Sequence, residues 1–160
     1  MAESEDGIIA TDDFMAVIDG STSKTNLCLH PGTTNGRYCM TLIKQYISQA
    51  ARDLSCENFC RGVTAFVRSH YDSNQLTRLA EHPEERATAS CAVYSDERRE
   101  VWLVGDCQCL VDGTLHDNPK PAEAAIARKR AAFARQLLDT NAASVESLRQ
   151  NDTTRTLITK

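Results

Sequence analysis

The chain has 160 residues, 41% hydrophobic and 25% charged, and its 18 basic and 22 acidic side chains leave a net charge of −4. This composition is typical of one globular domain and excludes collagen-like and disordered chains. No apolar run approaches the roughly 18–20 residues of a membrane span, and the acidic start MAESEDG lacks the apolar core of a secretory signal. Because the net charge is negative, we expect no nucleic-acid partner. The sequence therefore predicts a single cytoplasmic domain over residues 1–160, with no membrane partner.

Seven cysteines are the one unusual count, and they stand at positions 28, 39, 56, 60, 91, 107 and 109. An odd number at irregular positions argues against a complete disulfide framework. No two pairs have zinc-finger spacing, so we interpret the cysteines as reduced, buried thiols in preference to a structural zinc site.

Two short apolar runs stand near the start of the chain, at residues 7–10 and 14–18. They are separated by Thr11-Asp12-Asp13, a pattern that predicts two strands joined by a tight acidic turn. Gly, Ser, Thr, Asn and Pro are frequent over residues 19–36, which is loop composition.

Helical periodicity follows the loop. Apolar residues three and four apart from Tyr38 to Leu54 predict an amphipathic helix with one buried side. A second helix is expected over 57–71, with a continuation through Leu76 and Leu79 that ends before Pro83.

The pattern then changes to short runs of β-branched and aromatic residues separated by turn signals, which predicts an antiparallel meander. Its expected strands are residues 86–94, 100–104, 107–111 and 114–116. After Pro121, the alanine-rich segment 122–138 predicts a helix, and a short helix is expected over 144–150. Strands, two helices, a meander and further helices in this order indicate an α+β fold.

Acidic side chains stand at the ends of the two N-terminal strands. Asp6 enters the first strand and Asp19 leaves the second, so an antiparallel hairpin brings both carboxylates to one edge. Gly20, directly after Asp19, lets backbone carbonyl come close to a ligand. Carboxylate and carbonyl oxygens are the ligands that hard divalent cations prefer. The alternative is that Asp19-Gly20 is only a turn and Glu5-Asp6 a solvated terminus.

Asp106 also stands at a sheet edge, because it follows an apolar strand and Gly105; a turn aspartate is the alternative. The whole ordered set consists of Glu5-Asp6, AVIDG at 16–20, RATAS at 86–90 and VWLVGDC at 101–107. This set resembles the N-terminal portion of the metal-dependent serine/threonine protein phosphatases of PPM type. The order and approximate spacing hold from residue 5 to about residue 120.

The resemblance implies an α-β-β-α sandwich, incomplete here at the C-terminal end, with a centre of two or more Mg²⁺ or Mn²⁺ ions at the sheet edge. Carried over by position, Asp6 and Asp19 would be carboxylate ligands, Asp19 bridging, and Gly20 would offer its carbonyl. Glu5 would hold a metal-bound water, and Asp106 matches the acid of an additional, weaker metal. A metal-bridging water would attack phosphoserine or phosphothreonine, so no covalent enzyme intermediate and no catalytic side chain beyond the ligands is needed.

The chain also departs from the family pattern. No Arg precedes the Glu5-Asp6 pair, Ser21 stands where the family often has His, and no Asp-Gly follows residue 120. Ser21 and Lys24, with the hydroxyls between them, are candidates for binding phosphate, with a solvated loop as the alternative.

Three functions remain open at this point. The first is metal-dependent hydrolysis of phosphoserine and phosphothreonine monoesters, on a phosphorylated protein or a small phosphomonoester. The second is a catalytically inactive, phosphatase-like binding or regulatory module that lacks the late metal ligands. The third is a thiol-rich structural domain whose acids are only turns. Metal binding at Asp19 separates the third from the other two.

Overall fold

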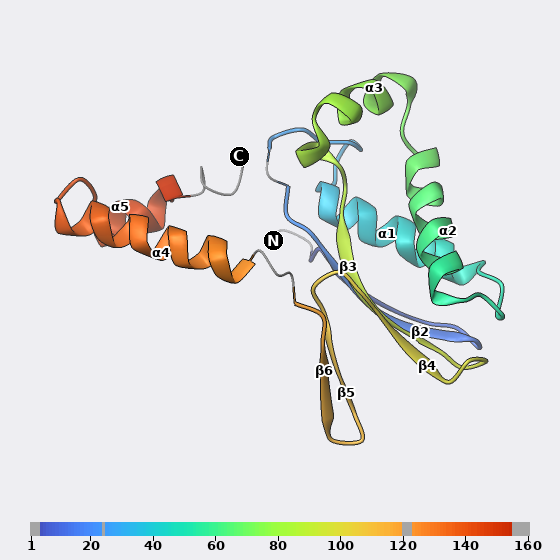
Figure 1. The fold of residues 1–160 in the computed structure, drawn as a ribbon. Helices are drawn as coiled ribbons and strands as arrows, with labels where there is room; N and C mark the ends of the chain where they lie inside the picture. Colours follow the sequence, from blue (N-terminus) through green and yellow to red (C-terminus); the bar gives the residue numbers. More distant parts are fainter. Residues whose placement is uncertain (1–3, 24, 120–122, 155–160) are drawn as a thin grey trace. The chain divides into compact units, whose positions relative to one another are not determined.

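The computed structural model describes residues 4–23, 25–119 and 123–154 of the chain (Figure 1). Its elements form two compact units, residues 1–118 and 119–160. The first unit holds six strands and three α-helices and the second unit holds two helices. The α+β class with antiparallel sheets, which the sequence predicts, is confirmed.

A four-stranded antiparallel sheet in the order β1-β2-β3-β4 is the centre of the first unit. Its strands are β1 (Asp6–Ala10), β2 (Phe14–Gly20), β3 (Ala89–Ser95) and β4 (Glu100–Val104). A separate two-stranded sheet consists of β5 (Gln108–Val111) and β6 (Thr114–Asp117). The predicted first hairpin is confirmed. Thr11 closes its turn, because the Thr11 N–H donates to the Phe14 carbonyl at 2.8 Å and the Thr11 hydroxyl accepts from the Phe14 N–H at 3.0 Å.

One face of the sheet forms the core. Phe14, Ala16 and Ile18 alternate along β2 as buried residues, and Trp102 on β4 packs 6.0 Å from Phe14 between ring centroids. Phe59 from the second helix lies 5.4 Å from Trp102. Figure 1 shows the first two helices running along this side of the sheet.

Three capped helices cover that face: α1 (Asn35–Ser48), α2 (Cys56–Ser69) and α3 (Ser73–Glu81). The predicted helix over Tyr38 to Leu54 therefore starts earlier and ends earlier than expected. Thr34 caps α1 by accepting a hydrogen bond from the Arg37 N–H at 3.2 Å. Ala50 and Leu54 pack against the core from the loop after α1, which is why their spacing looked helical.

The expected continuation of the second helix through Leu76 and Leu79 is wrong. The chain turns after α2 and starts α3 anew, because Asp72 and Gln75 form a capping box with hydrogen bonds of 2.8 and 3.0 Å. A 3-10 helix over Pro83–Glu85 follows α3, so β3 begins at Ala89 and not at residue 86.

The second unit confirms the two C-terminal helices, as α4 (Glu123–Asp139) and α5 (Val145–Gln150). Ser144 caps α5 through a capping box with Ser147. Arg130 of α4 forms an ion pair with Asp152 at 2.5 Å and donates to the Thr154 hydroxyl at 3.2 Å. This pair fixes the segment after α5 against α4.

The other face of the four-stranded sheet is apolar and open. Ile8, Met15 and Val17 expose 72%, 55% and 58% of their surface. Within the described ranges no second sheet covers these side chains, so the sandwich arrangement stays a prediction. No helix of the described part is long and apolar enough to cross a membrane.

All seven cysteines are free thiols. Cys39 and Cys91 are buried in the core, and burial raises the pKa of Cys39 to about 11 and that of Cys91 to about 12. These two thiols stay protonated at neutral pH and act as small apolar side chains. Cys28 is exposed and the other four are half-buried.

Candidate functional site

The register of the first hairpin pairs two acids directly. Asp6 on β1 lies opposite Asp19 on β2, and Asp19 in turn lies opposite Ser90 on β3. Side chains of directly opposed residues leave the same face of a sheet with Cβ atoms about 4.5–5.5 Å apart. The hairpin therefore brings both carboxylates to one end of the sheet, as the sequence pattern requires.

Asp19 is the electrostatic centre of this end. Burial, a hydrogen bond with Asp6, and the negative charges of Asp6, Asp106 and Glu5 together raise the pKa of Asp19 above its ordinary value of 3.8. Acids from two further stretches of the sequence, at the ends of two other strands, thus act on Asp19. Repulsion among carboxylates disfavours their ionised forms, and a bound cation would relieve it.

Glu5 is held at the same end by backbone and side-chain contacts. Its carboxylate accepts from the Thr22 hydroxyl at 2.9 Å, and its carbonyl accepts from the Gly20 N–H at 3.2 Å. The Glu5 carboxyl also packs against Gly36, in the first turn of α1, where a Cβ would come within 2.8 Å of the carboxyl carbon. A helix N-terminus is a favourable place for a carboxylate, because the helix dipole is positive there.

Gly20 is required by close packing of the backbone. A Cβ on Gly20 would overlap the carbonyl oxygen of Gly36, so β2 approaches the start of α1 without space for a side chain. The sequence predicted that Gly20 permits a close backbone approach, and the neighbour that comes close is α1. A metal-ligand role for the Gly20 carbonyl stays a prediction.

Asp106 is anchored by Ser90. The Ser90 hydroxyl donates a very short hydrogen bond to the Asp106 carboxylate and accepts from the Asp106 N–H at 3.2 Å. Gly105 has φ of 82°, and a Cβ on it would overlap Ser90, so the turn before Asp106 requires glycine. Ser90 was not singled out from the sequence. The sequence signal that could have identified Ser90 is a small hydroxyl residue in a strand beside the expected acidic edge. In the structure this side chain is buried, with 7% exposure.

The candidate phosphate-binding residues are only partly placed. The Ser21 N–H donates to the Thr88 carbonyl at 2.9 Å and its side chain is exposed, whereas Lys24 lies outside the described residues. Arg37, which the sequence reasoning missed, donates from Nη1 to the Ser4 carbonyl at 2.9 Å. A guanidinium from the first turn of α1 therefore lies beside the Glu5-Asp6 pair.

The ligand atoms at this end of the sheet suit a hard cation, whereas the grouping of the acids does not form a complete metal site. The acids at this end offer only oxygen ligands, as Mg²⁺ and Mn²⁺ prefer. Yet across residues 4–23, 25–119 and 123–154 no three His, Cys, Asp or Glu side chains are grouped closely enough to hold a metal ion. Asp6 and Asp19 are thus a pair of carboxylates without a third acid of the described residues grouped closely enough with them.

Comparison with known proteins finds no matching family model and no matching curated protein. Two solved structures are similar. One is the serine/threonine phosphatase PstP/Ppp of Mycobacterium tuberculosis, with 17% identity and a TM-score of 0.44 over 94% of this chain and 58% of that chain. The other is the catalytic domain of the serine/threonine phosphatase PstP in complex with two manganese ions, with 17% identity and a TM-score of 0.46 over 91% of this chain and 57% of that chain.

Both similar structures are serine/threonine phosphatases, the class of protein that the sequence motifs resemble. The chain spans less than three-fifths of their length. At 17% identity, residue roles in this chain have to be argued from its own side chains.

Proposed function

We propose that this chain is a phosphatase-like domain that binds a divalent cation between Asp6 and Asp19 and hydrolyses phosphoserine and phosphothreonine monoesters. The observation that carries the proposal is the direct pairing of Asp6 with Asp19, together with the raised pKa of Asp19. An unrelieved cluster of carboxylates costs stability, and a cation removes that cost.

In this proposal each acid has its own task. Asp6 and Asp19 hold the cation with the Gly20 carbonyl, and Asp106, oriented by Ser90, serves a second and weaker cation site. Glu5, fixed by Thr22, hydrogen-bonds a water at the site. A bound Mg²⁺ or Mn²⁺ supplies Lewis-acid activation of water and offsets the charge of the phosphoryl group.

The phosphate is bound by groups around the acids. Arg37 provides a planar guanidinium, whose forked N–H groups match phosphate oxygens, and Ser21 and Lys24 provide a hydroxyl and an ammonium group. The substrate is a phosphorylated protein or a small phosphomonoester.

Cation binding is tested by thermal unfolding with Mn²⁺ and with a chelator, on the wild type and on Asp19→Asn. A cation at about one hundred times its Kd stabilises the native state by about 2.7 kcal/mol. We expect Mn²⁺ to raise the melting temperature of the wild type and not that of Asp19→Asn. The control is Asp12→Asn, an exposed acid in the turn at the opposite end of the hairpin, which should respond like the wild type.

With the chelator, Asp19→Asn should itself melt higher than the wild type. The raised pKa shows that the ionised form of Asp19 is disfavoured in the folded state, and the amide removes that charge. If Mn²⁺ stabilises all three proteins equally, the cation binds elsewhere and the proposed site is wrong.

Hydrolysis is tested separately with p-nitrophenyl phosphate and a phosphothreonine peptide. We expect turnover that requires Mn²⁺ and is lost in Asp19→Asn. Arg37→Gln should raise KM by about tenfold, the effect of one charge-assisted hydrogen bond, whereas Arg52→Gln, in the turn that follows α1, should leave it unchanged. Mn²⁺ binding without turnover would contradict catalysis and identify an inactive phosphatase-like module.

A further inference from the structure

A cavity of about 410 Å³ lies between the three helices and the sheet of the first unit. Its walls come from α1, α2 and α3 and from β3 and β4, with side chains such as Ile43, Val67, Leu79 and Val104. Ligand pockets in proteins measure about 300–1,000 Å³ and are mostly apolar. In size and in lining, this cavity therefore matches a site for a small molecule.

The polar groups of the cavity carry one sign of charge. Arg68 from α2 and Arg86 from the segment before β3 line it, and none of the described residues around it is Asp or Glu. Arg68 makes no ion pair with any residue of the described part. Arg86 donates from Nε to the Leu79 carbonyl at 3.0 Å, which leaves its two terminal nitrogens for another acceptor. Both arginines are exposed residues, and their positive charge favours an anion at this side of the cavity.

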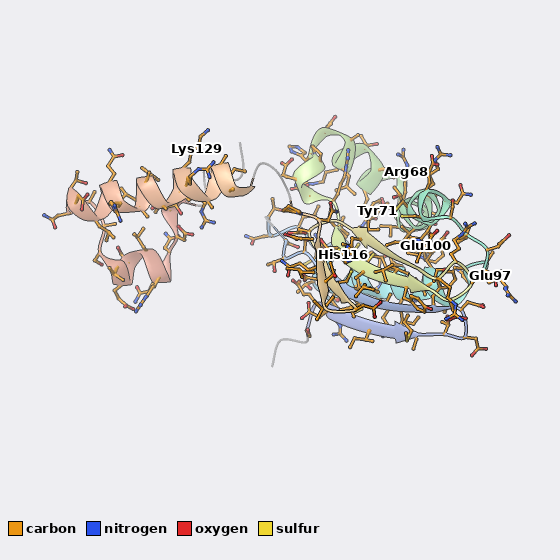
Figure 2. The ribbon with its side chains drawn as sticks, turned by 60° about the horizontal axis from the view of Figure 1, so that its bottom comes forward. Arg68, Tyr71, Glu97, Glu100, His116 and Lys129 are labelled. Carbon is orange, nitrogen blue, oxygen red and sulfur yellow. The ribbon has the colours of Figure 1, made fainter. Side chains whose placement is uncertain are left out.

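Tyr71 adds a neutral donor. Its hydroxyl accepts from the Ala87 N–H at 3.3 Å, and among residues of the described ranges it donates to none. Figure 2 shows Tyr71 and Arg68 close to α2, which is seen end-on, and both residues line the cavity. The hydroxyl hydrogen is thus available beside a guanidinium.

We infer that this cavity binds a small aliphatic carboxylate, whose chain fills the apolar volume and whose head is held by Arg68, Arg86 and the Tyr71 hydroxyl. Arginine pairs with a carboxylate through two parallel hydrogen bonds. The inference is independent of the proposed phosphatase activity, since no residue of the cavity belongs to the acidic cluster.

The test is isothermal titration calorimetry with octanoate, decanoate and dodecanoate, all below their micelle concentrations, and with decanol as the uncharged match of decanoate. Each two added methylenes should tighten Kd about tenfold until the chain exceeds the cavity. Decanol should bind about tenfold more weakly than decanoate, because it cannot pair with the guanidinium groups.

Two pairs of variants locate the site. Arg68→Gln should remove the preference for decanoate over decanol, while Arg61→Gln, also on α2 but outside the cavity, should keep it. Ala80→Phe places a ring in the cavity and should abolish binding, while Ala65→Phe, an exposed alanine of α2 outside the cavity, should not. Val63→Phe fills the cavity from α2 and replaces Ala80→Phe in the test if that variant does not fold.

Three results would overturn the inference. Equal affinity for decanol and decanoate shows that no charge is recognised. Wild-type affinity in a folded Ala80→Phe or Val63→Phe variant shows that the ligand binds elsewhere. Equal losses in Arg68→Gln and Arg61→Gln show that only the overall charge of α2 matters.

Discussion

The two faces of the four-stranded sheet are both apolar, and only one of them is covered. On the helix side, Phe14, Ile18 and Val93 expose 2%, 0% and 0% of their surface. On the other side, Ile8 on β1 and Val17 on β2 expose 72% and 58%. Strands that are apolar on both faces are typical of sheets covered on both sides. Hydrophobicity thus selects the strands, and the helices decide which face becomes the core.

The largest effect on the free energy of unfolding is expected from a comparison of two neighbouring residues on β2. Phe14→Ala should lower the free energy of unfolding by about 3–5 kcal/mol, because it leaves a cavity beside Trp102. Met15→Ala, on the opposite face at 55% exposure, should cost about 1 kcal/mol or less. Urea unfolding followed by circular dichroism measures both. Equal losses of unfolding free energy in the two variants would contradict the difference between the faces, since the open face would then be buried in solution.

A smaller effect is expected from a close backbone contact on the covered side. Gly20→Ala should destabilise by about 1–3 kcal/mol, because its Cβ meets the backbone of Gly36, which cannot move away. Gly7→Ala should cost less, since its Cβ meets only the flexible side chains of Met40 and Lys44. The melting temperatures of the two variants give the comparison. A Gly7→Ala cost as large as that of Gly20→Ala would contradict the backbone explanation.

The covered side also holds a buried charge. The side chain of Glu85, 7% exposed, pairs with Arg78 at 2.5 and 2.8 Å. Hydrogen bonding to this guanidinium holds the pKa of the Glu85 carboxyl below its ordinary value of 4.5. A pKa lowered by folding contributes stability that is present above 4.5 and is lost as the pH falls through the folded-state value.

Unfolding free energies measured from pH 7 down to pH 3 follow this loss. Arg78→Gln should be less stable than the wild type at neutral pH, and the difference should shrink in acid. A constant difference over the whole range would mean that the ion pair does not contribute through the Glu85 charge.

The smallest effect is expected on the water side of α2. Glu57 and Arg61 form an exposed pair four residues apart, with 72% and 74% of their side-chain surface accessible. Glu57→Gln should change the free energy of unfolding by less than about 0.5 kcal/mol, and added salt should remove the difference. A larger change would show that this side of α2 is not simply solvated.

Local patterns made the first hairpin and the acidic edge predictable. Apolar runs separated by a short acidic turn allow essentially one pairing, so the approach of Asp6 to Asp19 followed from the turn alone. The break between α2 and α3 was missed, because the apolar spacing continues across it, although the capping box at Asp72 starts a new helix there.

The sequence by itself determined the α+β order, the strands of the sheet and the acids at its end, since each depends on residues close together in the chain. Only the tertiary structure joined Ser90 to Asp106, 16 residues apart, and brought Arg37 to Ser4, 33 residues apart. The tertiary structure also decided which apolar face of the sheet is buried, and it formed the cavity that Arg68 lines. Such contacts depend on how helices pack across a sheet, and side-chain periodicity carries no information about partners far along the chain.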